Sequence, residues 1–134
     1  MASRFEYGLR QWREEFPKGK VVAVFGVGLD GHTCGIIPDI NPEKTKSKEL
    51  FKNRFNDTDK WVVGYDDANN EYKERVTITM PFIKEQVDHA VVFVSGENKR
   101  KALDNLLASE GDINKTPARV LRDIKDVEVF TDIL

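Results

Sequence analysis

The sequence has little of several features that mark particular classes of protein. A single cysteine, Cys34, excludes a disulfide within the chain and fits a reducing compartment. No apolar run approaches the roughly 20 residues that a membrane-spanning helix needs. The first residues turn polar at Ser3 and Arg4, unlike those of a signal peptide. We therefore expect a cytoplasmic protein with no membrane segment.

Excess basic charge and metal-binding patterns are lacking as well. The formal net charge of the 134 residues is −2, and lysines alternate with acidic residues instead of forming a basic face. This distribution predicts no nucleic-acid partner. His32, Cys34 and His89 do not have the spacing of zinc ligands, so no metal is expected.

Alternating strand-like and helix-like segments make up most of the chain. Residues 21–25 and 90–94 are continuous apolar runs, which are typical of strands buried on both faces of a parallel sheet. The other predicted strands are 61–65, 75–80 and 127–130. Helices are predicted from Ser3 to Phe16, from Pro81, from Gly96 to a buried stripe that ends at Leu107, and from Thr116 and Pro117.

This order of elements predicts the fold class. Strands that alternate with helices indicate an α/β protein, a three-layer sandwich with a Rossmann-like, mainly parallel sheet. We expect one domain over residues 1–134, with the strands 21–25 and 90–94 side by side at the centre of the sheet.

Local signals refine the helix ends and one long connection. Ser3 and Glu6 have the spacing of a capping box, and Thr116 before a proline is expected to cap the helix that follows. Residues 39–60 are polar and charged, with few apolar anchors. We expect a long loop there, carrying one or two helical turns.

A glycine-rich segment directly after the strand 21–25 has two interpretations. Gly26, Gly28 and Gly31 match G-x-G-x-x-G, which in a dinucleotide-binding fold opens a long helix facing the pyrophosphate. Here Pro38 interrupts the segment, and no strand ending in an acidic residue follows at the required distance. The segment therefore predicts no nicotinamide cofactor, and no other cofactor is expected.

Two side chains of the same segment can carry chemistry. Asp30 and His32 come at the carboxyl end of a parallel strand, where open α/β sheets place their ligands. An exposed imidazole there can accept a proton from water near neutral pH, and a carboxylate two residues away can orient the ring. A structural role for the histidine stays open. Cys34 is an alternative nucleophile without an evident orienting group, or a small buried hydrophobe.

Four blocks of the sequence, taken in order, match the pattern of one enzyme family. The letters GVGLDGHT and IIP in residues 26–38 resemble the signature G-x-G-x-D-G-H-T-x-S-L-F-P. Residues 75–81 resemble R-V-T-L-T-L-P, residues 92–103 resemble V-x-G-x-x-K-A-x-A-L, and residues 116–132 resemble a terminal P-A helix with a V-x-x-x-x-D strand. These blocks resemble the 6-phosphogluconolactonase and glucosamine-6-phosphate isomerase family over nearly the whole chain.

The resemblance implies an activity and a set of site residues. It implies that His32, with Asp30 beside it, is the general base that activates water against the carbonyl of 6-phosphogluconolactone. It implies that Lys99 contacts the substrate phosphate, with Arg75 as a second cation. Gly28 and Gly31 would belong to the substrate-binding turn. The substrate would be a phosphorylated sugar lactone of the pentose phosphate pathway, and the threonine after His32 favours the lactonase branch.

Departures from the family pattern keep alternatives open. The resemblance is to the C-terminal half only, and the family's first half supplies a Gly-Gly-Ser-type phosphate loop and an acidic segment that have no match here. Cys34 and Gly35 stand where the signature has its serine. A truncated homologue that binds sugar phosphates without catalysis and an amino-sugar isomerase are the alternatives. Half of a layered fold exposes apolar surface, so we expect a homo-oligomer, a dimer in the simplest case.

Overall fold

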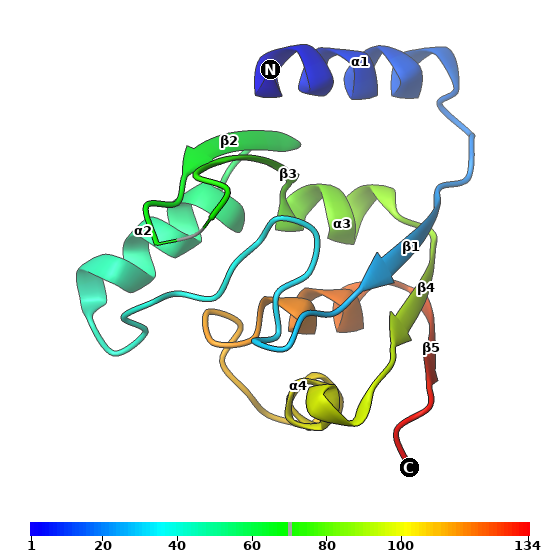
Figure 1. Cartoon of the computed structure of the whole chain (residues 1–134). Coiled ribbons are helices and arrows are strands. Elements are labelled where there is room, and N and C mark those ends of the chain that lie inside the picture. Colours follow the sequence, from blue (N-terminus) through cyan, green and yellow to red (C-terminus); the bar gives the residue numbers. More distant parts are fainter. Residues whose placement is uncertain (70) are drawn as a thin grey trace.

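The computed structural model describes residues 1–69 and 71–134. Within these residues no helix is long and apolar enough to cross a membrane. Figure 1 shows the elements, whose order is α1 (Ala2–Glu15), β1 (Val22–Gly26), α2 (Thr45–Phe55), β2 (Val62–Asp66), β3 (Glu74–Ile78), α3 (Met80–Gln86), β4 (His89–Val94), η1 (Glu97–Lys99), α4 (Arg100–Leu107), η2 (Pro117–Asp123) and β5 (Asp126–Thr131).

A three-stranded parallel sheet organises the fold. Its strand order is β1-β4-β5, so that β4 lies between the other two strands. Val92 of β4 is in register with Phe25 of β1 on one side and with Val129 of β5 on the other. The strands β2 and β3 form a separate antiparallel pair. The α/β class with a mainly parallel sheet, expected from the sequence, is confirmed.

One face of this sheet carries the hydrophobic core. Phe25, Ala90, Val92 and Val94 point to this face at alternate positions of their strands and are buried. Figure 1 shows α3 and η2 beside this face. The helical side chains of the same core are Met80, Phe82, Ile83, Ala102, Leu103, Leu106, Ala118, Val120 and Leu121. Leu107, which was expected in the stripe, is 55% exposed because it follows Leu106 onto the next face of the helix.

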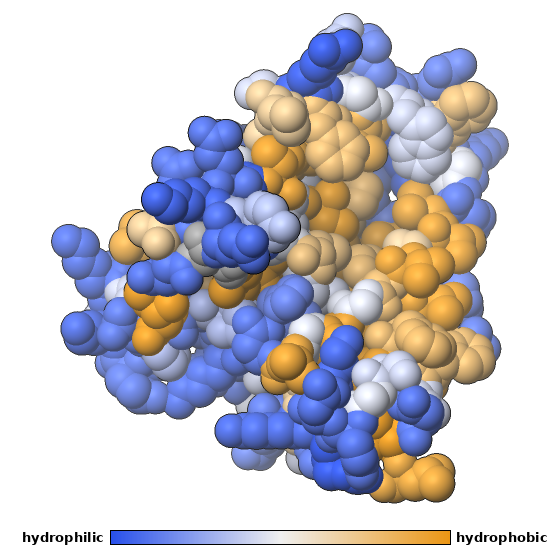
Figure 2. Space-filling model, in the orientation of Figure 1, coloured by the Kyte–Doolittle hydropathy of each residue, from blue (hydrophilic) through white to orange (hydrophobic). Residues whose placement is uncertain are grey.

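The opposite face of the sheet is open to solvent in the described chain. Val22 and Val24 of β1 are 65% and 77% exposed, and Phe93 and Phe130 are exposed beside them. Figure 2 shows apolar side chains gathered on this side of the molecule, over the three strands. We call Val22, Val24, Phe93 and Phe130 the outer face.

The outer face corrects one expectation from the sequence. The segments 21–25 and 90–94 do pair in parallel, as expected. The first of them is an edge strand, however, and its outward side chains are uncovered, so its predicted burial at the sheet centre is wrong. The physical reason is that residues 1–69 and 71–134 supply helices to the inner face only.

The segment 39–60 also differs from its expectation. Instead of one or two turns it holds the 11-residue helix α2. Phe51 and Phe55, one turn apart, are buried with their ring centres 5.1 Å from each other, and Phe55 also packs edge-to-face on Tyr65 of β2. Two aromatic side chains thus hold α2 against the hairpin, although the rest of the helix is mostly polar.

Two predicted helix caps are wrong, although the segments are helical. The helix α1 begins at Ala2, which places Ser3 inside it, and no side chain caps its start. Thr116 makes no capping hydrogen bond to η2, which is a 3-10 helix. The threonine that does cap a helix is Thr79, whose hydroxyl accepts the N–H of Phe82 at 3.4 Å.

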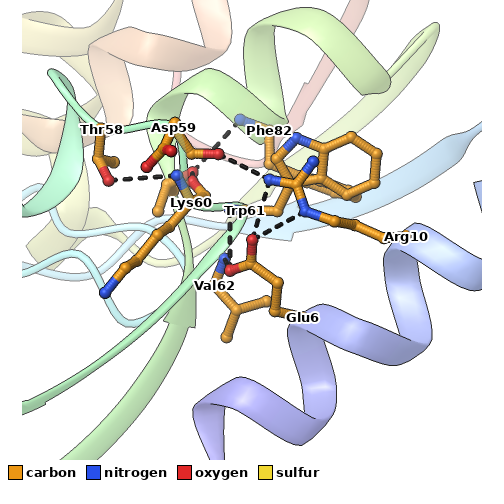
Figure 3. Close-up of polar contacts among 9 residues, drawn as sticks. Glu6, Arg10, Thr58, Asp59, Lys60, Trp61, Val62 and Phe82 are labelled. Atoms are coloured by element: carbon orange, nitrogen blue, oxygen red, sulfur yellow. Dashed lines mark hydrogen bonds and ion pairs between the residues drawn. The ribbon is translucent and has the colours of Figure 1, made fainter.

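Polar contacts attach α1 to the edge of the hairpin, as Figure 3 shows. None of the residues of α1 is buried. Glu6 accepts the backbone N–H groups of Trp61 at 3.2 Å and Val62 at 3.0 Å with one oxygen, and pairs with Arg10 at 2.9 Å through the other. Arg10 in turn donates to the carbonyl of Asp59 and lies 4.4 Å from the centre of the Trp61 ring. Glu6, predicted to close a capping box, instead anchors the helix.

This anchor has a consequence for the acid stability of the fold. Desolvation alone would raise the pKa of Glu6, but the N–H groups of Val62 and Trp61 and the charge of Arg10 lower it below its ordinary value of 4.5. A carboxyl with a depressed folded-state pKa stabilises the fold above its ordinary pKa. The stabilisation is lost as the pH falls through the folded-state pKa.

We expect Glu6→Gln to lower the free energy of unfolding at pH 7 by about 1 kcal/mol, the usual net contribution of one hydrogen bond, because the amide keeps one acceptor oxygen but loses the charge. The variant should also lose less stability than the wild type between pH 7 and pH 3. Urea unfolding at both pH values measures this. Glu14→Gln, exposed on the same helix, is the control. Equal acid sensitivity of wild type and Glu6→Gln would contradict the anchor.

Candidate active site

The glycine-rich turn after β1 folds back on itself. The N–H of Gly28 donates to the carbonyl of His32 at 2.9 Å, and the N–H of Gly31 donates to the carbonyl of Gly28 at 3.0 Å. The hydroxyl of Thr33, which is fully buried, donates to the carbonyl of Gly26 at 2.9 Å. These bonds hold His32 close to the carboxyl end of β1. No long helix follows, because the next helix is α2, so the dinucleotide-binding interpretation has no structural support.

His32 and Asp30 form a hydrogen-bonded pair. Asp30 Oδ1 lies 2.6 Å from His32 Nδ1 and also accepts the backbone N–H of His32 at 3.0 Å. An ionised carboxylate can only accept, so Nδ1 of the neutral ring carries the proton and Nε2 carries the free lone pair. Partial burial would raise the pKa of Asp30, but the hydrogen bonds and charge of His32 lower it. The pair is therefore ready to accept a proton at Nε2.

Gly28 makes room for this pair. A Cβ atom at position 28 would lie 2.2 Å from Cε1 and Nδ1 of the His32 ring and 2.9 Å from Oδ1 of Asp30. Separations this short do not occur between real atoms, so any side chain at position 28 displaces the imidazole. Gly31 serves the backbone instead: its φ is +85°, in the region that favours glycine, and its carbonyl accepts the N–H of Ala118.

The structure brings Lys99 to the same place as His32. The two residues line one cleft of about 780 Å³, together with Gly26, Val27, Gly28, Leu29, Asp30 and Cys34; we call it the His32 cleft. Lys99 reaches it because β1 and β4 are parallel neighbours, so that the turn after each strand lies at the same edge of the sheet. Within residues 1–69 and 71–134, the Lys99 ammonium has no ion-pair partner.

Arg75 lies elsewhere. It stands on β3 and faces Asp67 at 3.9 Å, and it is not among the residues that line the His32 cleft. Its Nε is buried and lacks a hydrogen-bond partner among the described residues. The predicted role of Arg75 as a second phosphate cation is therefore not supported by its position. Val27 and Leu29 also line the cleft. The sequence analysis did not predict them as site residues, because only their position in the glycine-rich turn could have indicated that role.

Cys34 has the wrong chemistry for a nucleophile at neutral pH. It lines the His32 cleft and keeps exposed surface, but burial of its thiol raises the pKa to about 11. The thiol is then protonated, whereas the thiolate is the reactive form. The other histidine, His89, pairs with Asp126 at 2.7 Å near the outer face and lies outside the cleft. In the described part of the chain, no group of three or more His, Cys, Asp or Glu residues could hold a metal ion.

Several curated proteins similar to this chain are named 6-phosphogluconolactonase. The 6-phosphogluconolactonase of Homo sapiens is 31% identical over 100 residues, which cover 74% of this chain and 33% of the human protein. The 6-phosphogluconolactonase of Borreliella burgdorferi is 29% identical over 110 residues, covering 82% of this chain and 41% of that protein. The chain thus spans less than half the length of these relatives.

Solved structures agree on the fold. The 6-phosphogluconolactonase of Trypanosoma brucei superposes with a TM-score of 0.66 at 23% identity, covering 97% of this chain and 51% of that one. The enzyme from Plasmodium vivax gives a TM-score of 0.68 at 13% identity and covers 97% and 50%. The family model described as glucosamine-6-phosphate isomerases/6-phosphogluconolactonase matches residues 1–130. The chain therefore belongs to the glucosamine-6-phosphate isomerase/6-phosphogluconolactonase family.

Proposed function

We propose that this chain carries the general base and the phosphate-binding lysine of a hydrolase that opens a phosphorylated sugar lactone, 6-phosphogluconolactone. The observation that carries the proposal is the His32–Asp30 pair, 2.6 Å between Nδ1 and Oδ1, in a cleft that Lys99 also lines. The relatives named 6-phosphogluconolactonase supply the substrate class.

The proposed reaction needs one proton acceptor and one carbonyl. Nε2 of His32 takes a proton from water as the water oxygen bonds to the lactone carbonyl carbon. The ring C–O bond then breaks, and the proton passes from Nε2 to the departing oxygen, which becomes a hydroxyl. Asp30 holds the ring in the required tautomer and stabilises the imidazolium that forms between the two steps. The product is the open-chain acid, 6-phosphogluconate.

Lys99 supports the same proposal from the other end of the substrate. A phosphate carries close to two negative charges at neutral pH, and an ammonium without an ion-pair partner in the described chain can bind it with a charge-assisted hydrogen bond. The His32 cleft of about 780 Å³ is within the range of small-molecule sites. Such a lysine would hold the substrate in register without touching the reacting carbonyl.

A second function has a specific observation in its favour. Lys99 is the one cation that lines the His32 cleft among the described residues. One ammonium neutralises only part of the charge of a phosphate, which is close to two negative charges at neutral pH. A homologue that binds sugar phosphates without turnover is therefore the alternative, and it predicts ligand binding without catalysis.

Substitution of His32 tests the proposal directly. We expect His32→Ala to lower kcat for 6-phosphogluconolactone by roughly 10²–10⁴-fold, the usual loss for a general base. His89→Ala, at the histidine outside the cleft, should leave kcat unchanged. Lys99→Ala should raise KM with little change in kcat, because phosphate contacts differ little between ground and transition states, and Lys101→Ala is its control.

The lactone also hydrolyses spontaneously, so each rate is compared with a buffer blank. If the wild type does not exceed the blank but 6-phosphogluconate raises its melting temperature, the binding function replaces the enzymatic one. If neither turnover nor stabilisation is found, both functions are wrong for this chain.

Gly28→Ala tests the geometry of the pair. The new methyl group would lie where the His32 ring now sits, so the ring must rotate away from Asp30. We expect kcat to fall toward the level of His32→Ala, measured by steady-state kinetics. Gly26→Ala is a matched control, because position 26 lines the same cleft and a Cβ there meets no atom within 4 Å. A Gly28→Ala enzyme with wild-type kcat would show that the ring position is immaterial.

The outer face predicts self-association. Exposed apolar surface of this kind on an edge strand favours pairing with another molecule. We expect sedimentation velocity to show a dimer whose fraction rises with concentration. Val24→Lys and Phe93→Lys should each lower that fraction, whereas Ile40→Lys, at an exposed apolar residue outside this face, should not. A strictly monomeric wild type, or a dimer insensitive to both substitutions, would refute the role of this face.

A further inference from the structure

The turn that carries Lys99 is held by an acidic side chain from the far end of the chain. Ser95 and Gly96 follow β4 directly, and Asp132 follows β5, the parallel neighbour of β4. Both oxygens of Asp132 are used: Oδ2 accepts the hydroxyl of Ser95 at 2.8 Å, and Oδ1 accepts the backbone N–H of Gly96 at 2.8 Å. The carboxylate is therefore hydrogen-bonded to the turn between β4 and η1 at two neighbouring residues.

The Ser95–Gly96 turn leads directly to Lys99. The N–H of Lys99 donates to the carbonyl of Gly96 at 2.9 Å, so the lysine backbone is bonded to the residue that Asp132 fixes. Gly96 has a φ of +96°, a conformation that favours glycine, and a Cβ there would lie 2.9 Å from Asn98. The backbone direction after β4 is thus defined at Gly96, three residues before the side chain that enters the His32 cleft.

Other polar groups near Lys99 are occupied with different partners. Arg100, the first residue of α4, pairs with Glu97 and donates to the carbonyl of Leu134. Asp132 is not among the residues that line the His32 cleft, so it does not reach a ligand there. The N–H of Gly96 and the hydroxyl of Ser95 lower the pKa of Asp132, which keeps this acceptor ionised at neutral pH.

We infer that Asp132 is a positioning residue that fixes the Ser95–Gly96 turn and thereby aims Lys99 into the His32 cleft. The inference rests on the proposed function, because it assigns Lys99 to the substrate phosphate. It adds a residue outside the cleft whose effect on ligand binding passes through Lys99. Asp132 would then influence phosphate affinity, while the His32–Asp30 pair keeps its geometry.

A double-mutant cycle with 6-phosphogluconate as the ligand tests this inference. Lys99→Ala should raise Kd by tenfold or more, as for loss of a hydrogen bond between charged groups, and Asp132→Ala by about threefold to tenfold. In the Lys99→Ala background, Asp132→Ala should have no further effect, because its contribution depends on the lysine. If the two substitutions raise Kd independently, so that the double variant shows the product of the two single effects, the inference is wrong. Asp123→Ala, at an exposed acid that ends η2, is the control.

Two conservative variants separate positioning from a general loss of stability. Asn at position 132 keeps an oxygen for the Gly96 N–H, and its amide can donate to the Ser95 hydroxyl, so Asp132→Asn should retain most of the affinity. Ser95→Ala removes one of the two bonds and should have an intermediate effect. An Asp132→Asn variant as weak as Asp132→Ala would contradict the proposed geometry.

A measurement on the free protein keeps this test separate from the proposed function. Amide hydrogen exchange of Gly96 should accelerate by about tenfold or more in Asp132→Ala, while the buried amide of Val92 stays protected. If exchange at Gly96 is unchanged, Asp132 does not fix the turn, and the inference is wrong whatever the enzyme does. If exchange accelerates but the wild type binds no 6-phosphogluconate, Asp132 still fixes the turn and the proposed function is what fails.

Discussion

The parallel pairing of β1 with β4 is the contact on which the site depends. It sets two turns side by side, one carrying His32 and the other Lys99, although these residues are far apart in the sequence. Side chains support this pairing on one face of the sheet only. Phe25 and Val92, for example, belong to the same core as buried side chains of α3 and η2. A change in that register by one residue would reverse which side chains face the core. The geometry of the cleft therefore depends on the packing of a few apolar residues beneath it.

Much of the fold could be predicted from the sequence because burial leaves a visible pattern. The apolar runs 21–25 and 90–94 locate two of the three parallel strands, and the spacing of Ala102, Leu103 and Leu106 locates α4. The helix α2 was underestimated because two aromatic residues hold it and the rest of it is polar. The exposure of β1 could not be predicted either: a run that is apolar at every position predicts cover on both faces, while the described residues cover one.

The candidate site was predicted unevenly, for similar reasons. His32, Asp30 and Lys99 belong to sequence blocks that resemble a family, and the structure places all three along one cleft. Arg75 belongs to such a block too, yet it faces Asp67, since a block gives no direction for a side chain. The raised pKa of Cys34 depends on its surroundings in the folded turn. The contacts of Asp132 with Ser95 and Gly96 join segments that only the β4–β5 pairing brings together.

The glycine at position 28 shows how one sequence pattern can arise from two unrelated constraints. In a nucleotide-binding loop, the second glycine of G-x-G lets a phosphate approach the backbone. In this chain, the absent side chain is replaced by the protein's own imidazole, which occupies the space that a Cβ would need. A search for the three glycines alone therefore groups cofactor-binding loops with loops in which the glycine only leaves room for a neighbouring side chain. Here the residue four positions further on is His32, whose ring fills that space.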